Sequence, residues 1–161
     1  KIIFIPVGGS NLVLWTHRLA GLNRPEFHLY DRDDQPPVRS HNQEAVDAIN
    51  ARGCVAILTE KREMENYIHT AAIQSALAVN IVFGNFDDVP ELVAQELHRT
   101  TGGPTPWNSL DEKKRRQKVS QAKRRLNSQA TRAMTPALLT QLDTLDEVRT
   151  WLREISRLYN S

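Results

Sequence analysis

Three carboxylates follow an apolar run near the start of the chain. The run Phe27–Tyr30 stands directly before Asp31, Asp33 and Asp34. In an open α/β fold, such a run is typical of a buried strand that emerges at the carboxyl edge of its sheet, where ligands bind. Asp31 and Asp33 are two positions apart, so on an extended chain their side chains point the same way. Two hard oxygen ligands on one side suit Mg²⁺ or Mn²⁺, whereas aspartates ahead of a Pro-Pro pair are equally typical of a solvated turn.

A second charged cluster follows the next apolar run. Residues 54–58 are predicted to be a buried strand, and Glu60, Glu63 and Glu65 come directly after it. Neighbouring strand ends that both carry acid would face each other, and like charges so placed repel unless a cation lies between them. Glu63 and Glu65 are therefore candidate ligands, while Glu60 could equally be a residue that begins a helix.

A basic block lies in the second half of the chain. Between positions 113 and 125 there are eight basic residues and no acidic one, although the formal net charge of the chain is only +2. This distribution favours contact with the phosphate backbone of a nucleic acid, and the competing interpretation is a solvated helix face. The block consists of Lys113, Lys114, Arg115, Arg116, Lys118, Lys123, Arg124 and Arg125.

The elements expected to position these residues alternate between strands and helices over the first hundred positions. This order predicts a parallel sheet with right-handed crossovers. The predicted strands are 1–7, 27–30, 54–58 and 81–83; the predicted helices are 12–22, 43–52, 71–78 and one that begins after Asp88, its expected N-cap. A turn rich in glycine is expected at 8–11.

The remainder of the chain is predicted to be helical. A capping box of Ser109 and Glu112 is expected to begin the basic helix, and Thr144 with Glu147 a later one. The loop 101–107, which is rich in Gly and Pro, separates an α/β domain of residues 1–103 from a helical C-terminal segment of residues 104–161.

Composition limits the class of protein. The chain has 161 residues, enough for one domain or for one domain with a helical appendage. Its only cysteine, Cys54, lies in an apolar run and is expected to be a buried, inert thiol. We expect a reducing, cytoplasmic location, because a single cysteine forms no internal disulfide and neither a membrane-spanning run nor a signal peptide is visible.

Two of these stretches together resemble the Toprim nuclease domain of OLD-type (overcoming lysogenization defect) proteins. Asp31-Arg32-Asp33 and the run 61–68, KREMENYI, are similar to the second and third acidic motifs of that domain. The resemblance extends over roughly residues 1–90. It implies a Toprim/Rossmann-like parallel sheet flanked by helices, followed by an all-helical segment. It also implies an upstream ABC-type ATPase domain, which alone would use ATP.

The resemblance further implies a DNA endonuclease that depends on Mg²⁺ or Mn²⁺, acts by two-metal phosphodiester hydrolysis and defends against phage or mobile DNA. Asp31, Asp33 and Glu65 would bind metal. Glu63 would be catalytic, either through the second metal or by positioning water.

The family also uses a lysine downstream of its acidic motifs, which would neutralise charge in the transition state. Lys123 is preferred to Lys118 because it adjoins the apolar Ala122, close to where the basic helix should meet the sheet. The other basic residues of the block would bind DNA. The implied partners are DNA, the upstream ATPase and further copies of the chain in a homo-oligomer, with no membrane.

One part of the family pattern is missing. The pattern begins with a glutamate on an earlier strand, and residues 6–9 contain no acid. We therefore expect a fragment that begins after that motif and carries an incomplete metal site. Two alternatives stay open. One is a non-catalytic, Toprim-like interaction module, and the other is a receiver-like or HAD-like phosphoryl-transfer domain with Asp31 as phosphate acceptor. A receiver would lack the basic helical tail and would not need Glu63 or Glu65.

Overall fold

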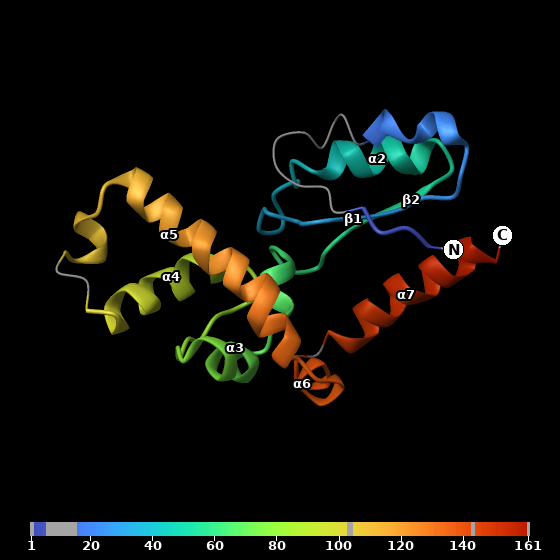
Figure 1. Ribbon diagram of the computed structural model, residues 1–161. Helices are drawn as coiled ribbons and strands as arrows, with labels where there is room; N and C mark the ends of the chain where they lie inside the picture. Colours follow the sequence, from blue (N-terminus) through green and yellow to red (C-terminus); the bar gives the residue numbers. More distant parts are fainter. Residues whose placement is uncertain (1, 6–15, 103–104, 143, 161) are drawn as a thin grey trace. The chain divides into compact units, whose positions relative to one another are not determined.

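The computed structural model describes residues 2–5, 16–102, 105–142 and 144–160, and is mostly helical with one small parallel sheet (Figure 1). This part of the chain forms two units. The first unit runs up to Glu60 and resumes at Asp146, and the second unit is Lys61–Leu145. The predicted boundary near residue 103 lies within the second unit, where α4 packs against α5.

The first unit contains the sheet. Strands β1 (Phe27–Tyr30) and β2 (Val55–Leu58) are parallel, with Phe27 paired to Val55 and Tyr30 to Leu58. Helix α2 (Gln43–Ala51) connects them and buries Val46 and Ile49 against the sheet. The predicted strands at 27–30 and 54–58 and the helix at 43–52 are thus confirmed to within two residues. Cys54 is a free thiol and only half-buried beside this core.

Within the described residues the sheet has two strands, fewer than predicted. Residues 2–5 are irregular and exposed rather than a buried strand, and the predicted turn at 8–11 lies outside the described residues. Of the predicted helix at 12–22, residues 12–15 lie outside the described residues, residues 16–18 are helical and the 3₁₀ turn η1 (Ala20–Leu22) follows. Residues 81–83 do not form a strand. Ile81 and Phe83 instead pack their side chains on a helical core, and Val82 between them is 93% exposed.

The second unit is helical. It begins with the 3₁₀ turn η2 (Met64–Tyr67), and its core contains Ile73, Val89, Val93 and Leu126, all fully buried. The remaining elements are α3 (Thr70–Leu77), α4 (Val89–Thr100), η3 (Trp107–Ser109), α5 (Glu112–Arg125), the π-helical turn η4 (Leu126–Ala130), η5 (Thr131–Ala133) and α6 (Pro136–Gln141).

Side-chain caps decide where the helices of this unit begin. Asp88 accepts a hydrogen bond from the Glu91 N–H, which confirms the predicted N-cap of α4. Helix α5 is capped by Asp111, which accepts from the Lys114 N–H, so the predicted capping box at Ser109 is wrong. Ser109 instead ends η3. Asp111 stands directly before the helix in extended backbone, the position and conformation in which an aspartate caps a helix.

Helix α7 (Leu145–Tyr159) returns the chain to the first unit. Trp151 is its buried residue, and the Glu147 carboxylate accepts a hydrogen bond of 2.8 Å from the backbone N–H of Glu60. Across the described ranges, none of the helices combines the length and the apolar composition needed to cross a bilayer.

Candidate active site

Two glutamates of the second unit are buried at the start of η2. Glu63 is 8% exposed and Glu65 only 1% exposed. The fully buried Asn66 holds this stretch in place: its Oδ1 accepts from the Glu63 N–H, and its Nδ2 donates to the carbonyls of Gly84 (3.0 Å) and Asp87 (3.2 Å). Buried carboxylates require compensation by a cation or by hydrogen-bond donors.

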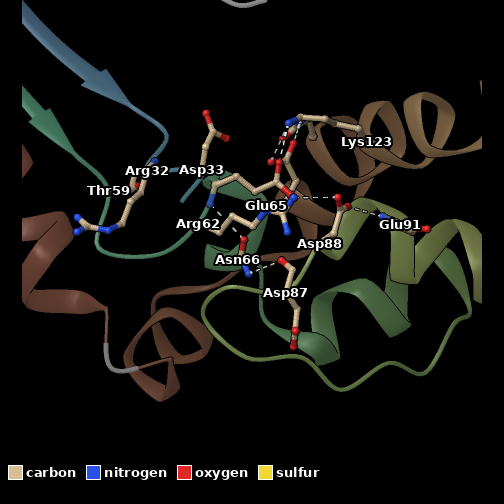
Figure 2. Close-up of polar contacts among 12 residues, drawn as sticks. Arg32, Asp33, Thr59, Arg62, Glu65, Asn66, Asp87, Asp88, Glu91 and Lys123 are labelled. Carbon is tan, nitrogen blue, oxygen red and sulfur yellow. Dashed lines mark hydrogen bonds and ion pairs between the residues drawn. The ribbon is translucent and has the colours of Figure 1, made fainter. Parts of the chain in front are cut away.

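Lys123 supplies that compensation. It lies in the last turn of α5, and its Nζ is 2.8 Å from Glu63 Oε2 and 3.4 Å from Glu65 Oε2 (Figure 2). Lys118, the other candidate lysine, forms no ion pair within the described part of the chain. The structure therefore brings together three of the predicted site residues, and Lys123 is the lysine that reaches the acidic pair.

Each glutamate also presents an oxygen that no hydrogen bond occupies. Glu65 Oε1 accepts from Asn127 Nδ2 at 2.7 Å, and Glu63 Oε2 accepts from Lys123. Glu63 Oε1 and Glu65 Oε2 are buried and have no hydrogen-bond partner in the described structure. Hard, anionic oxygens without donors are the ligand type that Mg²⁺ and Mn²⁺ prefer, so the chemistry of this pair fits such an ion.

Burial raises the pKa of Glu63 from its usual value of 4.5 to about 7. The hydrogen bond and positive charge of Lys123 act in the opposite direction, and the negative charges of Glu65 and Asp88 raise it further. A carboxyl with a pKa near 7 exchanges its proton close to neutral pH, which is typical of groups at functional sites.

The raised pKa of Glu63 predicts a stability that falls as the pH rises. Between pH 4.5 and 7 the folded state holds a proton on Glu63 that the unfolded state has released, so folding stability is lost over this window. The expected loss is up to about 3 kcal/mol, because one pKa unit corresponds to about 1.4 kcal/mol. Glu63→Gln is expected to flatten this dependence in urea unfolding at pH 5 and pH 8 with EDTA present. The exposed carboxyl variant Glu44→Gln is the control, and an unchanged slope in Glu63→Gln would contradict the assignment.

Arg62 connects the stretch that carries the glutamates to the stretch before α4. Its backbone N–H donates to the Asn85 carbonyl at 2.8 Å, and its guanidinium lies 3.2 Å from Asp88 Oδ2 (Figure 2). Asp88 therefore both begins α4 and pairs with Arg62. These contacts hold the stretch before α4 against the stretch that carries the glutamates.

An open groove of about 820 Å³ adjoins this cluster. Lys123 and Asn127 line it, together with three of the predicted DNA-binding residues, Arg115, Arg116 and Arg124. Acidic side chains line it as well, and Arg116 is ion-paired with one of them, Glu112. The other predicted DNA-binding residues do not line the groove; they are Lys113, Lys114, Lys118 and Arg125, and Lys114 pairs with the cap residue Asp111.

The aspartate cluster belongs to the first unit. Strand β1 ends at Tyr30, and Asp33 has a left-handed backbone with φ of 61°. The extended geometry assumed for Asp31 and Asp33 therefore ends before Asp33, and the argument that their side chains point the same way does not apply. Aspartate tolerates this conformation better than most residues because its short polar side chain bonds locally.

Local contacts hold the aspartate cluster in this shape. The side-chain amide of Asn42 donates to the Asp31 carbonyl (2.6 Å) and to Asp33 Oδ2 (3.0 Å). His41 lies between two carboxylates, with Nε2 3.1 Å from Asp33 Oδ2 and Nδ1 3.1 Å from Asp34 Oδ2.

The ends of the two strands are tied together. The backbone N–H of Arg32, just after β1, donates to the hydroxyl of Thr59, just after β2, at 2.9 Å. Thr59 is fully buried. This bond places the residues that follow the two strands at one edge of the sheet, as the parallel order predicted.

Sequence reasoning missed the amide side chains that hold the acidic residues. Asn42, Asn66 and Asn127 each donate to or orient a candidate site residue. Asn66 lies within the motif 61–68 without a predicted role, and neither Asn42 nor Asn127 is among the residues predicted for the site. For Asn127 a signal was present, because it stands four residues after Lys123 and so shares its helix face.

No group of three or more His, Cys, Asp and Glu side chains within the described ranges is arranged to hold a metal ion. The cluster around Lys123 contains two carboxylates, those of Glu63 and Glu65. The metal roles predicted for Asp31, Asp33 and Glu65 stay predictions. Comparison with protein-family models, with curated proteins and with solved structures found no match.

Proposed function

We propose that this chain is the nuclease part of an ATPase–nuclease, a Toprim-type DNA endonuclease that depends on Mg²⁺ or Mn²⁺ and acts in defence against phage or mobile DNA. One observation carries the proposal. Two buried glutamates with unoccupied oxygens share the ammonium of Lys123, which also lines a groove with three arginines. The sequence resemblance assigns nuclease roles to these same three residues.

The basic side chains that line the groove have two proposed roles, phosphate binding and charge neutralisation. Arg115 and Arg124 present guanidinium groups that can hold backbone phosphates, and their planar donor geometry suits phosphate oxygens. Lys123 is 44% exposed, so its ammonium can also contact a phosphate in the groove and reduce the negative charge that develops during hydrolysis.

Glu63 and Glu65 would hold a divalent ion through Glu63 Oε1 and Glu65 Oε2, the oxygens that accept no hydrogen bond. Such an ion would activate water and stabilise the leaving oxygen. The pKa of Glu63 is about 7 in the absence of an ion, and a bound divalent cation would lower it by stabilising the ionised carboxylate. The proposal includes Asp31 and Asp33 as further ligands, an upstream ABC-type ATPase as the partner domain, a homo-oligomer and a cytoplasmic location.

Plasmid cleavage by the full-length protein tests this function. We expect nicking or linearisation of supercoiled DNA with Mg²⁺ or Mn²⁺ and complete loss of cleavage when EDTA removes the metal. Rising salt should weaken DNA binding, because the arginine contacts release counterions from the phosphates. Cleavage that persists in EDTA would contradict the metal-dependent mechanism.

A non-catalytic interaction module is the second candidate. The observation in its favour is that Lys123 already compensates the buried acidic pair, as a purely structural ion pair would. Absence of cleavage with either metal, in the presence and absence of ATP, together with absence of Mn²⁺ binding, would favour this module.

A further inference from the structure

We propose that Asn127 is a positioning residue, which fixes the carboxylate of Glu65 so that its second oxygen stays available to a divalent cation. This inference rests on the proposed function and adds to it a residue that the acidic motifs do not contain. The contact that carries it is the hydrogen bond of 2.7 Å from Asn127 Nδ2 to Glu65 Oε1.

The two carboxylate oxygens of Glu65 have different environments. Oε1 is held by the Asn127 amide, whereas Oε2 is buried without a hydrogen bond and lies 3.4 Å from the Lys123 ammonium. A carboxylate held at one oxygen cannot rotate freely, so the other oxygen keeps a fixed direction. Partners that orient ligands in this way are part of most metal sites.

Asn127 is suited to this role because its amide is a neutral donor. A second cation at this place would compete with a metal ion for the glutamate, and a carboxylate would repel it. An amide instead orients the glutamate and leaves its negative charge unchanged. Lys123, one helical turn earlier, provides the charge compensation, so the two side chains have separate functions.

The backbone that carries Asn127 is a π-helical turn. The Thr131 N–H donates to the Leu126 carbonyl five residues earlier, and the fully buried Leu126 and Ala130 anchor the turn in the core. The Thr131 hydroxyl donates to the Asn127 carbonyl at 2.8 Å. The main chain of Asn127 is thus fixed from both sides, while its side chain lines the groove. Single π-helical turns occur frequently at functional sites.

Mn²⁺ binding to the full-length protein tests the inference, measured by calorimetry and by the loss of the free Mn²⁺ signal in electron paramagnetic resonance. Asn127→Leu keeps a similar volume without a donor. We expect its affinity for Mn²⁺ to fall about 10- to 100-fold, the usual effect of losing a partner that orients a ligand. Asn127→Gln, which keeps an amide donor, should lose less.

Gln129→Leu is the matched control, since it removes another amide from the same turn at an exposed position that does not line the groove. It should bind Mn²⁺ as the wild type does. In cleavage assays, Asn127→Leu should require more Mn²⁺ for half-maximal rate.

The outcomes separate this inference from the proposed function. Wild-type protein that binds no Mn²⁺ would overturn the proposed function and the role of Asn127 with it. Wild-type protein that binds Mn²⁺, with Asn127→Leu binding equally well, would overturn the role of Asn127 alone. An equal loss in Gln129→Leu would also overturn it, because the effect would then belong to the helical turn and not to the amide.

Discussion

Replacing Asp31 by Ala is expected to abolish metal-dependent DNA cleavage by the full-length protein while leaving the protein folded. Under the proposed function Asp31 is a ligand of a two-metal site, and its removal would take away both charge and coordination. We therefore expect a loss of at least about 1,000-fold in rate, comparable to other losses of charge-stabilising groups. Circular dichroism and plasmid cleavage on the same sample measure the two effects.

The fold should tolerate this change because the Asn42 amide bonds to the backbone carbonyl of Asp31, which alanine retains. The control is Asp47→Ala, an exposed carboxylate of the same unit that pairs with Arg39. It should cleave DNA at the wild-type rate. Wild-type cleavage by Asp31→Ala would remove Asp31 from the metal assignment.

Lys123→Ala is expected to reduce cleavage by about 100-fold or more while Mn²⁺ binding is retained. The ammonium would no longer neutralise charge in the transition state, and a single well-placed donor is typically worth about 10²–10³ in rate. Metal binding should persist, because both glutamates remain and lose a competing cation. Single-turnover cleavage and Mn²⁺ titration separate the two effects.

Lys118→Ala is the comparison variant, since Lys118 lies on the same helix without contact to the acidic pair. As a predicted DNA-binding residue it should affect only the affinity for DNA, so this variant should cleave at the wild-type rate when DNA is saturating. Loss of cleavage in Lys118→Ala with normal activity in Lys123→Ala would reverse the assignment. Lys123→Ala also leaves two buried carboxylates without their cation, which destabilises the fold. The double variant Lys123→Ala with Glu63→Gln should recover part of that stability and stay inactive. Recovery of cleavage in the double variant would show that Lys123 acts only on stability.

The parts of the fold that follow local rules could be predicted from the sequence. The apolar runs gave β1 and β2 and their parallel order, and the position of Asp88 before Pro90 gave the start of α4. The prediction of a strand at 81–83 is wrong, because the apolar side chains of so short a run can be buried equally well against helices. Periodicity does not distinguish these two environments in so short a segment.

In the candidate site, too, some features follow from local sequence and others from tertiary packing. The acid that follows a predicted strand made Glu63 and Glu65 candidate ligands. The family resemblance, by contrast, indicated a lysine, and the apolar neighbour Ala122 favoured Lys123 over Lys118. Their convergence, 2.8 Å between Lys123 and Glu63, depends on packing between residues sixty positions apart, which no local pattern encodes. The left-handed backbone of Asp33, whose carboxylate accepts a hydrogen bond from Asn42, likewise differs from the extended geometry expected after the strand.

The sequence by itself therefore determined the charged residue types, the two strands and most helix starts, since these follow from hydrophobic periodicity and capping. Only the tertiary structure decided which lysine meets the acidic pair, which oxygens stay without donors and that Asn127 holds Glu65. The physical reason is that buried charges are compensated by whichever donors the packed core brings within hydrogen-bond distance, and that distance is set by the whole fold.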